Sequence, residues 1–195
     1  MSNLNNFCKQ QIPRLNNLKG YVSEIHGSHN TGKTKFLLEY VLENQKLNNN
    51  FICAYIDTGT QLRNCSVLEK INKDKIWFIF LNRTILLSDT IIDIAKQTDL
   101  IIIDDFTNLN QNPWSLLKNL QKIAKKTNVT ILLANQLRYV IFKCNNTIQT
   151  SYQPYRYNVI KSYCKYSIDL DTNEIINFNQ NLNLAIGEEL NSLLI

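Results

Sequence analysis

Paired cysteines, long apolar runs and glycines are all scarce in this chain of 195 residues. Its five cysteines are odd in number, widely spaced and without a C-x-x-C pair, which argues against a disulfide framework or a zinc site. No apolar run approaches the roughly 20 residues of a membrane span, and the first residues lack a basic segment followed by an apolar one. We therefore expect a protein of a reducing intracellular compartment, the cytoplasm or a nucleus, without a membrane partner. The cysteines are Cys8, Cys53, Cys65, Cys144 and Cys164.

The length of the chain suits one α/β domain. With 44% hydrophobic residues it can bury a substantial core, whereas two such domains would find little room. We divide it into a polar lead-in at residues 1–19, a core at 20–177 and a tail at 178–195. The end of the tail, residues 190–195, has the pattern of a short amphipathic helix.

Acidic residues are missing from a long stretch of the sequence, although the net charge is only +5. Between Phe106 and Ile168 there is no Asp or Glu, while lysines, arginines and aromatic residues alternate there. Cations for phosphates and flat rings for bases suit a single-stranded nucleic acid site. The alternative is a solvated helix face for the first four lysines and core packing for some of the tyrosines. The residues are Lys118, Lys122, Lys125, Lys126, Arg138, Lys143, Arg156, Lys161 and Lys165, with Tyr139, Phe142, Tyr152, Tyr155, Tyr157, Tyr163 and Tyr166.

Two of only five glycines stand in a complete G-x-x-x-x-G-K-[ST] motif, which predicts a loop that binds the phosphates of a nucleoside triphosphate, expected to be ATP with Mg²⁺. Glycine lets the backbone take positive φ and approach the phosphates, and the following helix points its free N–H groups at the same charge. Lys33 is expected to reach the β- and γ-phosphates, and Thr34 to ligate Mg²⁺. The motif is Gly27-Ser28-His29-Asn30-Thr31-Gly32-Lys33-Thr34.

The sequence around this motif predicts a parallel sheet with helices on its faces. An apolar strand-like run precedes the motif, and apolar residues recur after it at helical spacing, at Phe36, Leu37, Tyr40 and Val41. Four further short apolar runs, each followed by helical or turn sequence, read as central strands. The five expected strands are 21–25, 51–56, 76–80, 100–103 and 129–134.

The run at residues 100–103 is followed by Asp104-Asp105, the apolar-then-Asp pattern of a Walker B element. A carboxylate at the carboxyl end of a buried strand beside a phosphate loop can hold Mg²⁺. We therefore expect Asp104 to be the magnesium partner of Thr34.

The order of these features resembles the RecA/RadA recombinase family over residues 18–170. Residues 18–27 resemble the family's G-x-[IV]-x-E-I-x-G entry to its phosphate loop, and residues 53–58 its second strand. Residues 98–104 are similar to its Walker B strand. The most specific likeness is at Thr130 to Arg138, which resembles the family's h-h-h-x-N-Q-h-R strand, with Asn135-Gln136 at its centre. Residues 159–170 resemble the strand after the second DNA-binding loop.

The resemblance implies a single RecA-like P-loop NTPase domain that acts on single-stranded DNA in recombination or repair. Gln136 would sense the γ-phosphate through its side-chain amide and pass the nucleotide state to the second DNA-binding loop, at residues 138–156. That loop lies in the acid-free segment. The alternative for Gln136 is an ordinary polar residue at a strand end. The residues expected to contact DNA are Arg138, Tyr139, Lys143, Tyr155, Arg156 and Lys161.

The sequence departs from the family at the residue that activates water. The family has a catalytic Glu two residues after the Asp that ends the second strand, whereas this chain has Gly59 after Asp57. Asp105 is the substitute base that we expect to complete the catalytic set with Lys33 and Gln136, and its alternative role is to cap the following turn.

Two other functions remain open for this sequence. One is a non-hydrolysing subunit that uses ATP structurally and docks on a recombinase partner, and the other is a small P-loop kinase. Residues 1–19 match none of the family's polymerisation elements, so we expect no long filament. A homo-oligomer and a recombinase partner are both compatible with the chain.

Overall fold

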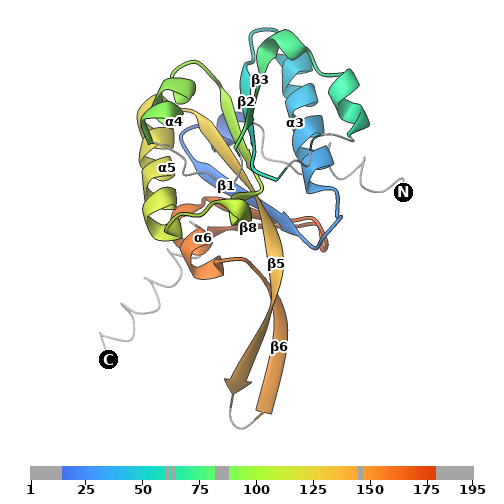
Figure 1. The fold of residues 1–195 in the computed structure, drawn as a ribbon, viewed down its shortest axis with the longest axis vertical. Coiled ribbons are helices and arrows are strands. Elements are labelled where there is room, and N and C mark those ends of the chain that lie inside the picture. The colour runs from blue at the N-terminus through green and yellow to red at the C-terminus, as the bar shows by residue number, and fades with distance from the viewer. Residues whose placement is uncertain (1–14, 60–61, 63–64, 82–87, 145–146, 179–195) are drawn as a thin grey trace, which may run out of the picture.

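The computed structural model describes residues 15–59, 62, 65–81, 88–144 and 147–178, without the side chains of residues 15, 16, 88, 139–144 and 147–152. A mostly parallel sheet forms the centre, and helices cover both of its faces (Figure 1). The expected α/β class with a parallel central sheet is therefore confirmed. The boundaries of the lead-in, core and tail stay predictions, and the helix expected at residues 190–195 lies outside the described residues.

Eight strands make up the sheet, in the spatial order β3-β2-β4-β5-β1-β7-β8, with β6 paired to β5. The strands from β3 to β7 run parallel, whereas β8 is antiparallel to β7 and β6 is antiparallel to β5. All five expected strands are present, with ends that differ by a few residues except for β5, which is longer. The strands are β1 (Val22–Gly27), β2 (Cys53–Asp57), β3 (Ile76–Phe80), β4 (Leu100–Asp104), β5 (Thr130–Cys144), β6 (Thr147–Pro154), β7 (Tyr166–Asp169) and β8 (Glu174–Asn177).

The helices divide between the two faces of the sheet. One face carries α4, α5 and α6, and the other carries α2, α3 and the short 3₁₀ turn η2, as the two buried apolar clusters and Figure 1 show. The helical elements are α2 (Leu15–Leu18), α3 (Lys33–Leu47), η2 (Ser66–Glu69), η3 (Lys73–Lys75), α4 (Ser88–Ala95), η4 (Phe106–Asn108), α5 (Pro113–Thr127) and α6 (Tyr157–Tyr163). Among the described helices, none is long and apolar enough to cross a membrane.

Strands β2 and β4 are apolar up to their last residue because both faces of the sheet are covered. In β4, Ile101 and Ile103 pack under α4 and α5, while Leu100 and Ile102 pack under α3. This alternation follows from the two-residue period of a strand. Burial on both sides explains why these runs could be recognised as strands from sequence.

The structure corrects the expected second DNA-binding loop. Residues 137–144 pair antiparallel with residues 147–154, so most of the expected loop is a β-hairpin that continues β5 beyond the body of the sheet (Figure 1). The strand expected over residues 159–170 is also wrong in its first half, which is helix α6, and right at Tyr166–Asp169, which is β7. Both runs are rich in β-branched and aromatic residues, and tertiary packing decides between strand and helix.

Candidate functional site

The glycine loop, residues 27–34, joins β1 to α3 as its motif predicts. Gly32 takes φ 90° as the residue that caps α3, and Lys33 begins the helix. A Cβ at Gly27 would lie 2.6 Å from Thr31 Oγ1, closer than such atoms approach each other. Gly32 is therefore required for its left-handed backbone, and Gly27 for the close approach of Thr31. The four residues expected on the buried face of α3 are buried.

Lys33 folds back over this loop. Its Nζ donates to the carbonyl oxygens of Gly27 at 3.0 Å and Ser28 at 2.8 Å. Partial burial lowers the pKa of Lys33, while the charges of Asp105, Asp104 and Asp171 act in the opposite direction. The ammonium therefore lies at the mouth of the loop, facing carboxylates from other elements.

Asp104 stands at the carboxyl end of β4, beside Asp57 of β2 in the strand register. Thr34 Oγ1 donates to Asp104 Oδ2 at 2.7 Å, and Tyr55 OH donates to the same oxygen at 2.6 Å. Burial raises the pKa of Asp104 against the effect of these two hydrogen bonds, and the nearby charges of Asp105 and Asp57 raise it further. The structure thus brings the two predicted magnesium ligands together, with Tyr55 as a partner that the sequence analysis missed.

The donor set at Asp104 fits Mg²⁺ better than a transition metal. The described residues contain no group of three or more His, Cys, Asp or Glu side chains that could hold a metal. Mg²⁺, however, is commonly bound by one or two protein oxygens, with water and phosphate oxygens completing its shell. A hydroxyl and a buried carboxylate in contact, Thr34 and Asp104, meet that requirement.

Asp105 and Gln136 form a second pair next to the first. Gln136 Nε2 donates to Asp105 Oδ2, while Asp105 Oδ1 accepts from Thr107 N at 2.9 Å and Thr107 Oγ1 at 2.6 Å. Asp105 therefore caps the turn η4, as its alternative role predicted, and also faces Gln136. β5 lies between β4 and β1, which places Gln136 beside Gly27 in register.

Thr58 fixes the backbone of Asp105 and was not singled out from sequence. Its hydroxyl donates to the carbonyl oxygen of Asp105 at 2.6 Å and accepts from the amide of Asp105 at 2.8 Å. The amide of Thr58 donates to the carbonyl oxygen of Asp104 at 2.7 Å. Gly59, where a catalytic Glu would stand, donates its amide to Asp57 Oδ1 at 2.9 Å.

A buried polar network lies beneath the loop and was also missed. Glu24 accepts from Ser167 Oγ at 2.6 Å and from the side-chain amide of Asn135. Ser167 also contacts His26 Nδ1 at 3.0 Å, and Asp169 lies 3.5 Å from His26 Nε2. Burial lowers the pKa of His26, but contacts with Glu24 and Asp169 outweigh that effect and raise it above 6.5. The network ties β1, β5 and β7 together.

The foot of the hairpin is joined to Gln136 through the main chain. Tyr155 N donates to the Gln136 carbonyl oxygen at 2.8 Å, and Asn135 Nδ2 donates to the Tyr155 carbonyl oxygen at 2.9 Å. The guanidinium carbons of Arg138 and Arg156 lie 3.8 Å and 4.5 Å from the centroid of the Tyr155 ring. Three of the six residues expected to contact DNA therefore form one cluster.

The other three residues are placed differently. Lys161 is exposed on α6, the helix that Arg156 caps, and no contact joins it to this cluster in the described part of the structure. Tyr139 and Lys143 belong to the hairpin strand, but their side chains lie outside the described part of the structure. Lys165, also in the basic segment, bonds the carbonyl oxygen of Asn17 and lies over the Tyr21 ring.

Asp171, in the turn between β7 and β8, binds the glycine loop. Its carboxylate accepts from Ser28 N at 2.8 Å and from Ser28 Oγ at 3.1 Å. Asp169 Oδ1 accepts from the amide of Asp171 at 2.8 Å and so shapes this turn. A negative charge from the far side of β1 is therefore held against the predicted phosphate loop.

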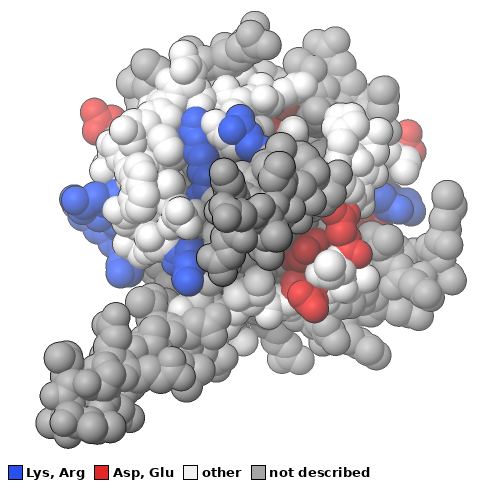
Figure 2. Space-filling model, turned by 90° about the horizontal axis from the view of Figure 1, so that it is seen from below, with Lys and Arg blue, Asp and Glu red and all other residues white. Residues whose placement is uncertain are grey.

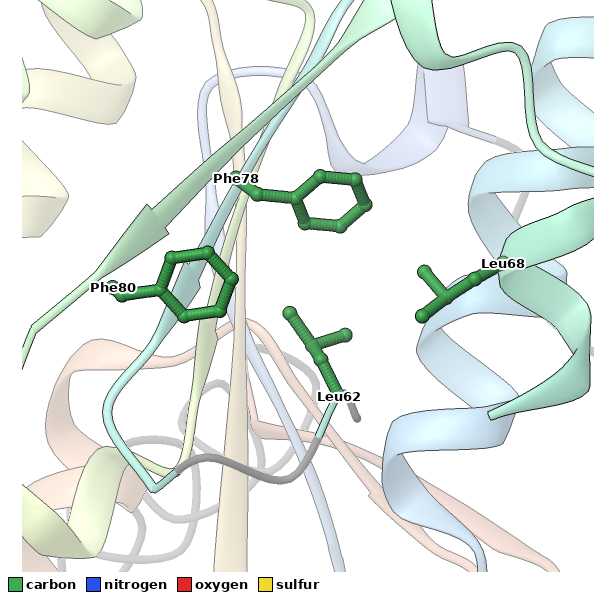
Figure 3. Close-up of a pocket in the computed structure, with 4 residues that line it drawn as sticks. All are labelled: Leu62, Leu68, Phe78 and Phe80. Atoms are coloured by element: carbon green, nitrogen blue, oxygen red, sulfur yellow. The ribbon is translucent and has the colours of Figure 1, made fainter. Parts of the chain in front are cut away.

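An apolar pocket lies at the edge strand β3, where the ring of Phe78 is 6.1 Å from that of Tyr55, measured between centroids. Figure 3 shows Leu62, Leu68, Phe78 and Phe80 around it. None of the residues that we expected in a functional site lines it. The pocket is therefore not the site that the sequence predicts.

No protein-family model and no curated protein matches the sequence of this chain.

Proposed function

We propose that this chain is a RecA-like P-loop ATPase that binds ATP with Mg²⁺ and acts on single-stranded DNA in recombination or DNA repair. The observation that carries the proposal is the contact of Thr34, from the glycine loop, with Asp104, 70 residues away at the end of β4. The sequence predicted this pair from two separate motifs. Two unrelated motifs would not be expected to bring a hydroxyl and a carboxylate into hydrogen-bonding contact by chance.

The residues of the site suit triphosphate binding. The N-terminus of α3 and the backbone of the glycine loop would bind the β- and γ-phosphates, with Lys33 released from the loop carbonyls to reach them. Thr34 and Asp104 would hold Mg²⁺, which neutralises phosphate charge when bound. Burial of Asp104 supports this role, because its raised pKa reflects a carboxylate that would gain from a nearby cation.

Asp105 and Gln136 would act on the reacting end of the nucleotide. Asp105 is the candidate to accept a proton from the attacking water, and Gln136 the candidate to contact the γ-phosphate. Each contact would compete with the Gln136 to Asp105 hydrogen bond. A change at Gln136 would reach the hairpin through the Tyr155 to Gln136 main-chain bond.

DNA would bind at the foot of the hairpin. Arg138 and Arg156 supply guanidinium groups that can donate to phosphate oxygens while they lie over the ring of Tyr155. Because both cations already cover Tyr155, its role there would be to orient the arginines, with base stacking left to other rings.

A second function is favoured by one specific observation. Gly59 provides no carboxylate where the family has its catalytic Glu, and both side-chain oxygens of the substitute, Asp105, accept hydrogen bonds from protein groups. A non-hydrolysing subunit that binds ATP structurally and docks on a recombinase partner would need no base. It would keep Lys33, Thr34 and Asp104.

Nucleotide binding and turnover test the two functions separately. MgATP affinity is measured by calorimetry for the wild type and for Lys33→Ala, and steady-state turnover for the wild type and for Asp105→Asn. The ATPase predicts binding that Lys33→Ala abolishes and turnover that Asp105→Asn abolishes. Binding without turnover in the wild type would select the structural subunit, and absence of MgATP binding would contradict both.

A further inference from the structure

Trp114 is one of three large hydrophobic side chains that are exposed in the described part of the chain, with 47% of its surface accessible. It stands in the first turn of α5, where Asn112 Oδ1 accepts from its backbone amide at 3.0 Å. Its ring and the ring of Tyr163 of α6 form a T-shaped pair, with centroids 5.9 Å apart and planes at 79°. The ring is therefore held in place by a second aromatic residue while about half of it faces solvent.

A row of lysines continues from Trp114 along α5. Lys118, Lys122 and Lys126 follow at four-residue steps, so each lies beside the next on the helix surface, and Lys125 lies next to them. All four are exposed, whereas the opposite side of α5 packs its leucines and isoleucine into the core. At 1.5 Å per residue, the row from Trp114 to Lys126 spans about 18 Å.

The charged side chains of this row are all positive. In the described part of the structure, none of the four lysines forms a salt bridge, and α5 and α6 contain no acidic residue. On the other side of α5, α4 carries Asp89 and Asp93, of which Asp93 pairs with Lys96 of its own segment. Figure 2 shows lysine and arginine side chains on the left, the side on which α5 lies in Figure 1, with acidic side chains above them at that edge and a larger acidic group right of centre.

The aromatic end of the row lies next to the foot of the hairpin. Arg156 Nη1 donates to the carbonyl oxygen of Gln111, three residues before Trp114, at 3.4 Å. Gln121 Nε2 donates to the carbonyl oxygen of Tyr163 at 3.3 Å, which fixes α6 against α5. The Arg138, Tyr155 and Arg156 cluster and the row on α5 therefore adjoin one another.

We infer that the α5 row, Trp114 with Lys118, Lys122, Lys125 and Lys126, binds single-stranded nucleic acid. Trp114 stacks on a base and the lysines contact phosphates along the strand, which continues there from the arginines at the hairpin foot. A single strand fits better than a duplex because its bases are free to meet an exposed ring. The inference rests on the proposed function, since it extends the DNA path, but it concerns residues outside the nucleotide site.

Fluorescence anisotropy of a labelled oligo-dT of about 20 nucleotides tests the surface, since single-strand sites commonly span up to about 16 nucleotides. We expect Trp114→Ala to weaken binding at least about fivefold and Trp114→Phe to restore most of the loss. The double variant Lys118→Gln with Lys122→Gln should make the negative slope of log K against log salt less steep by about 1.4. Matched controls are Phe80→Ala, an exposed aromatic residue on β3, and Lys70→Gln with Lys73→Gln, exposed lysines near α3 on the opposite face of the sheet.

The outcomes separate this surface from the proposed function. Equal affinity and equal salt slope for the α5 variants, with a wild type that binds oligo-dT, would overturn the α5 row and leave the proposed function standing. A wild type that fails to bind oligo-dT at low salt would overturn both. Equal losses in the control variants would also refute the assignment to α5. Thermal unfolding of each variant identifies any loss of fold. If Trp114→Ala does not fold, the salt dependence of the lysine double variant decides whether the α5 row binds DNA.

Discussion

Thr58 offers a sharp test of how the structure holds Asp105, and Thr58→Val is the perturbation. Valine keeps the shape of threonine but removes the hydroxyl that accepts from the Asp105 amide at 2.8 Å and donates to its carbonyl oxygen at 2.6 Å. The carbonyl oxygen keeps a second donor, the amide of Asn108 at 3.2 Å, whereas the described residues provide the amide with no other acceptor. A buried donor is thus left unpaired.

The expected size of this effect follows from that one donor. An unsatisfied buried amide costs about 1–3 kcal/mol, so we expect Thr58→Val to lower the free energy of unfolding by about 2 kcal/mol. Thr58→Ser keeps the hydroxyl and loses one methyl group, which costs about 0.8 kcal/mol. The predicted order of stability is Thr, then Ser, then Val.

Urea unfolding, monitored by circular dichroism, measures these differences. An unchanged slope of the unfolding free energy against urea concentration indicates that the variants unfold to comparable states. We also expect ATP turnover to fall more in Thr58→Val than in Thr58→Ser, because Asp105 is displaced only in the valine variant. A valine variant within about 0.5 kcal/mol of the wild type, or more stable than the serine variant, would contradict these expectations.

Three further predictions concern charged groups near the glycine loop. The pKa of His26 is raised above 6.5 in the folded protein, so its protonation stabilises the fold below pH 6.5. This stabilisation is lost as the pH rises through the raised pKa. Urea unfolding from pH 5 to 9 should show the loss in the wild type and not in His26→Gln. Burial raises the pKa of Asp104, so the charge of this carboxylate opposes folding at neutral pH. Asp104→Asn should therefore melt at a higher temperature, while its ATP binding loses the dependence on Mg²⁺. A lower melting temperature would contradict this. Asp171→Asn removes a negative charge but keeps an acceptor for Ser28, so MgATP should bind about two- to fivefold more tightly at low salt; an unchanged or weaker affinity would show that the carboxylate mainly orders the loop.

The parts of the site that could be predicted from sequence are those encoded in short, local patterns. The glycine loop needs two glycines and a lysine at set spacing, and Asp104 follows a strand that is apolar on both faces. Their contact follows once both lie at the carboxyl edge of a parallel sheet. The pairing of Thr34 with Asp104 could therefore be predicted from sequence.

Tyr55, Thr58 and Asp171 could not be predicted because their roles depend on register between strands far apart in sequence. Tyr55 lies within a buried strand and looks like a core residue until the pairing of β2 with β4 brings its hydroxyl to Asp104. Asp171 lies in a turn whose position depends on β7 pairing with β1. Neither pairing has a local signal.

The hairpin, by contrast, had a signal that the family resemblance overrode. Residues 139–142 are Tyr-Val-Ile-Phe, residues 147–152 contain Thr, Ile and Tyr, and Asn145-Asn146 stands between them. Two β-prone runs around a short polar pair are typical of a hairpin. The likeness to a loop-bearing family led to the wrong expectation for this segment.

The rate of ATP turnover, measured with and without single-stranded DNA, reports on the nucleotide site, the DNA site and their coupling in one experiment. We expect a Mg²⁺-dependent rate that rises when DNA is added and disappears in Lys33→Ala. A rate indistinguishable from that of Lys33→Ala, both with and without DNA, would contradict the proposed function.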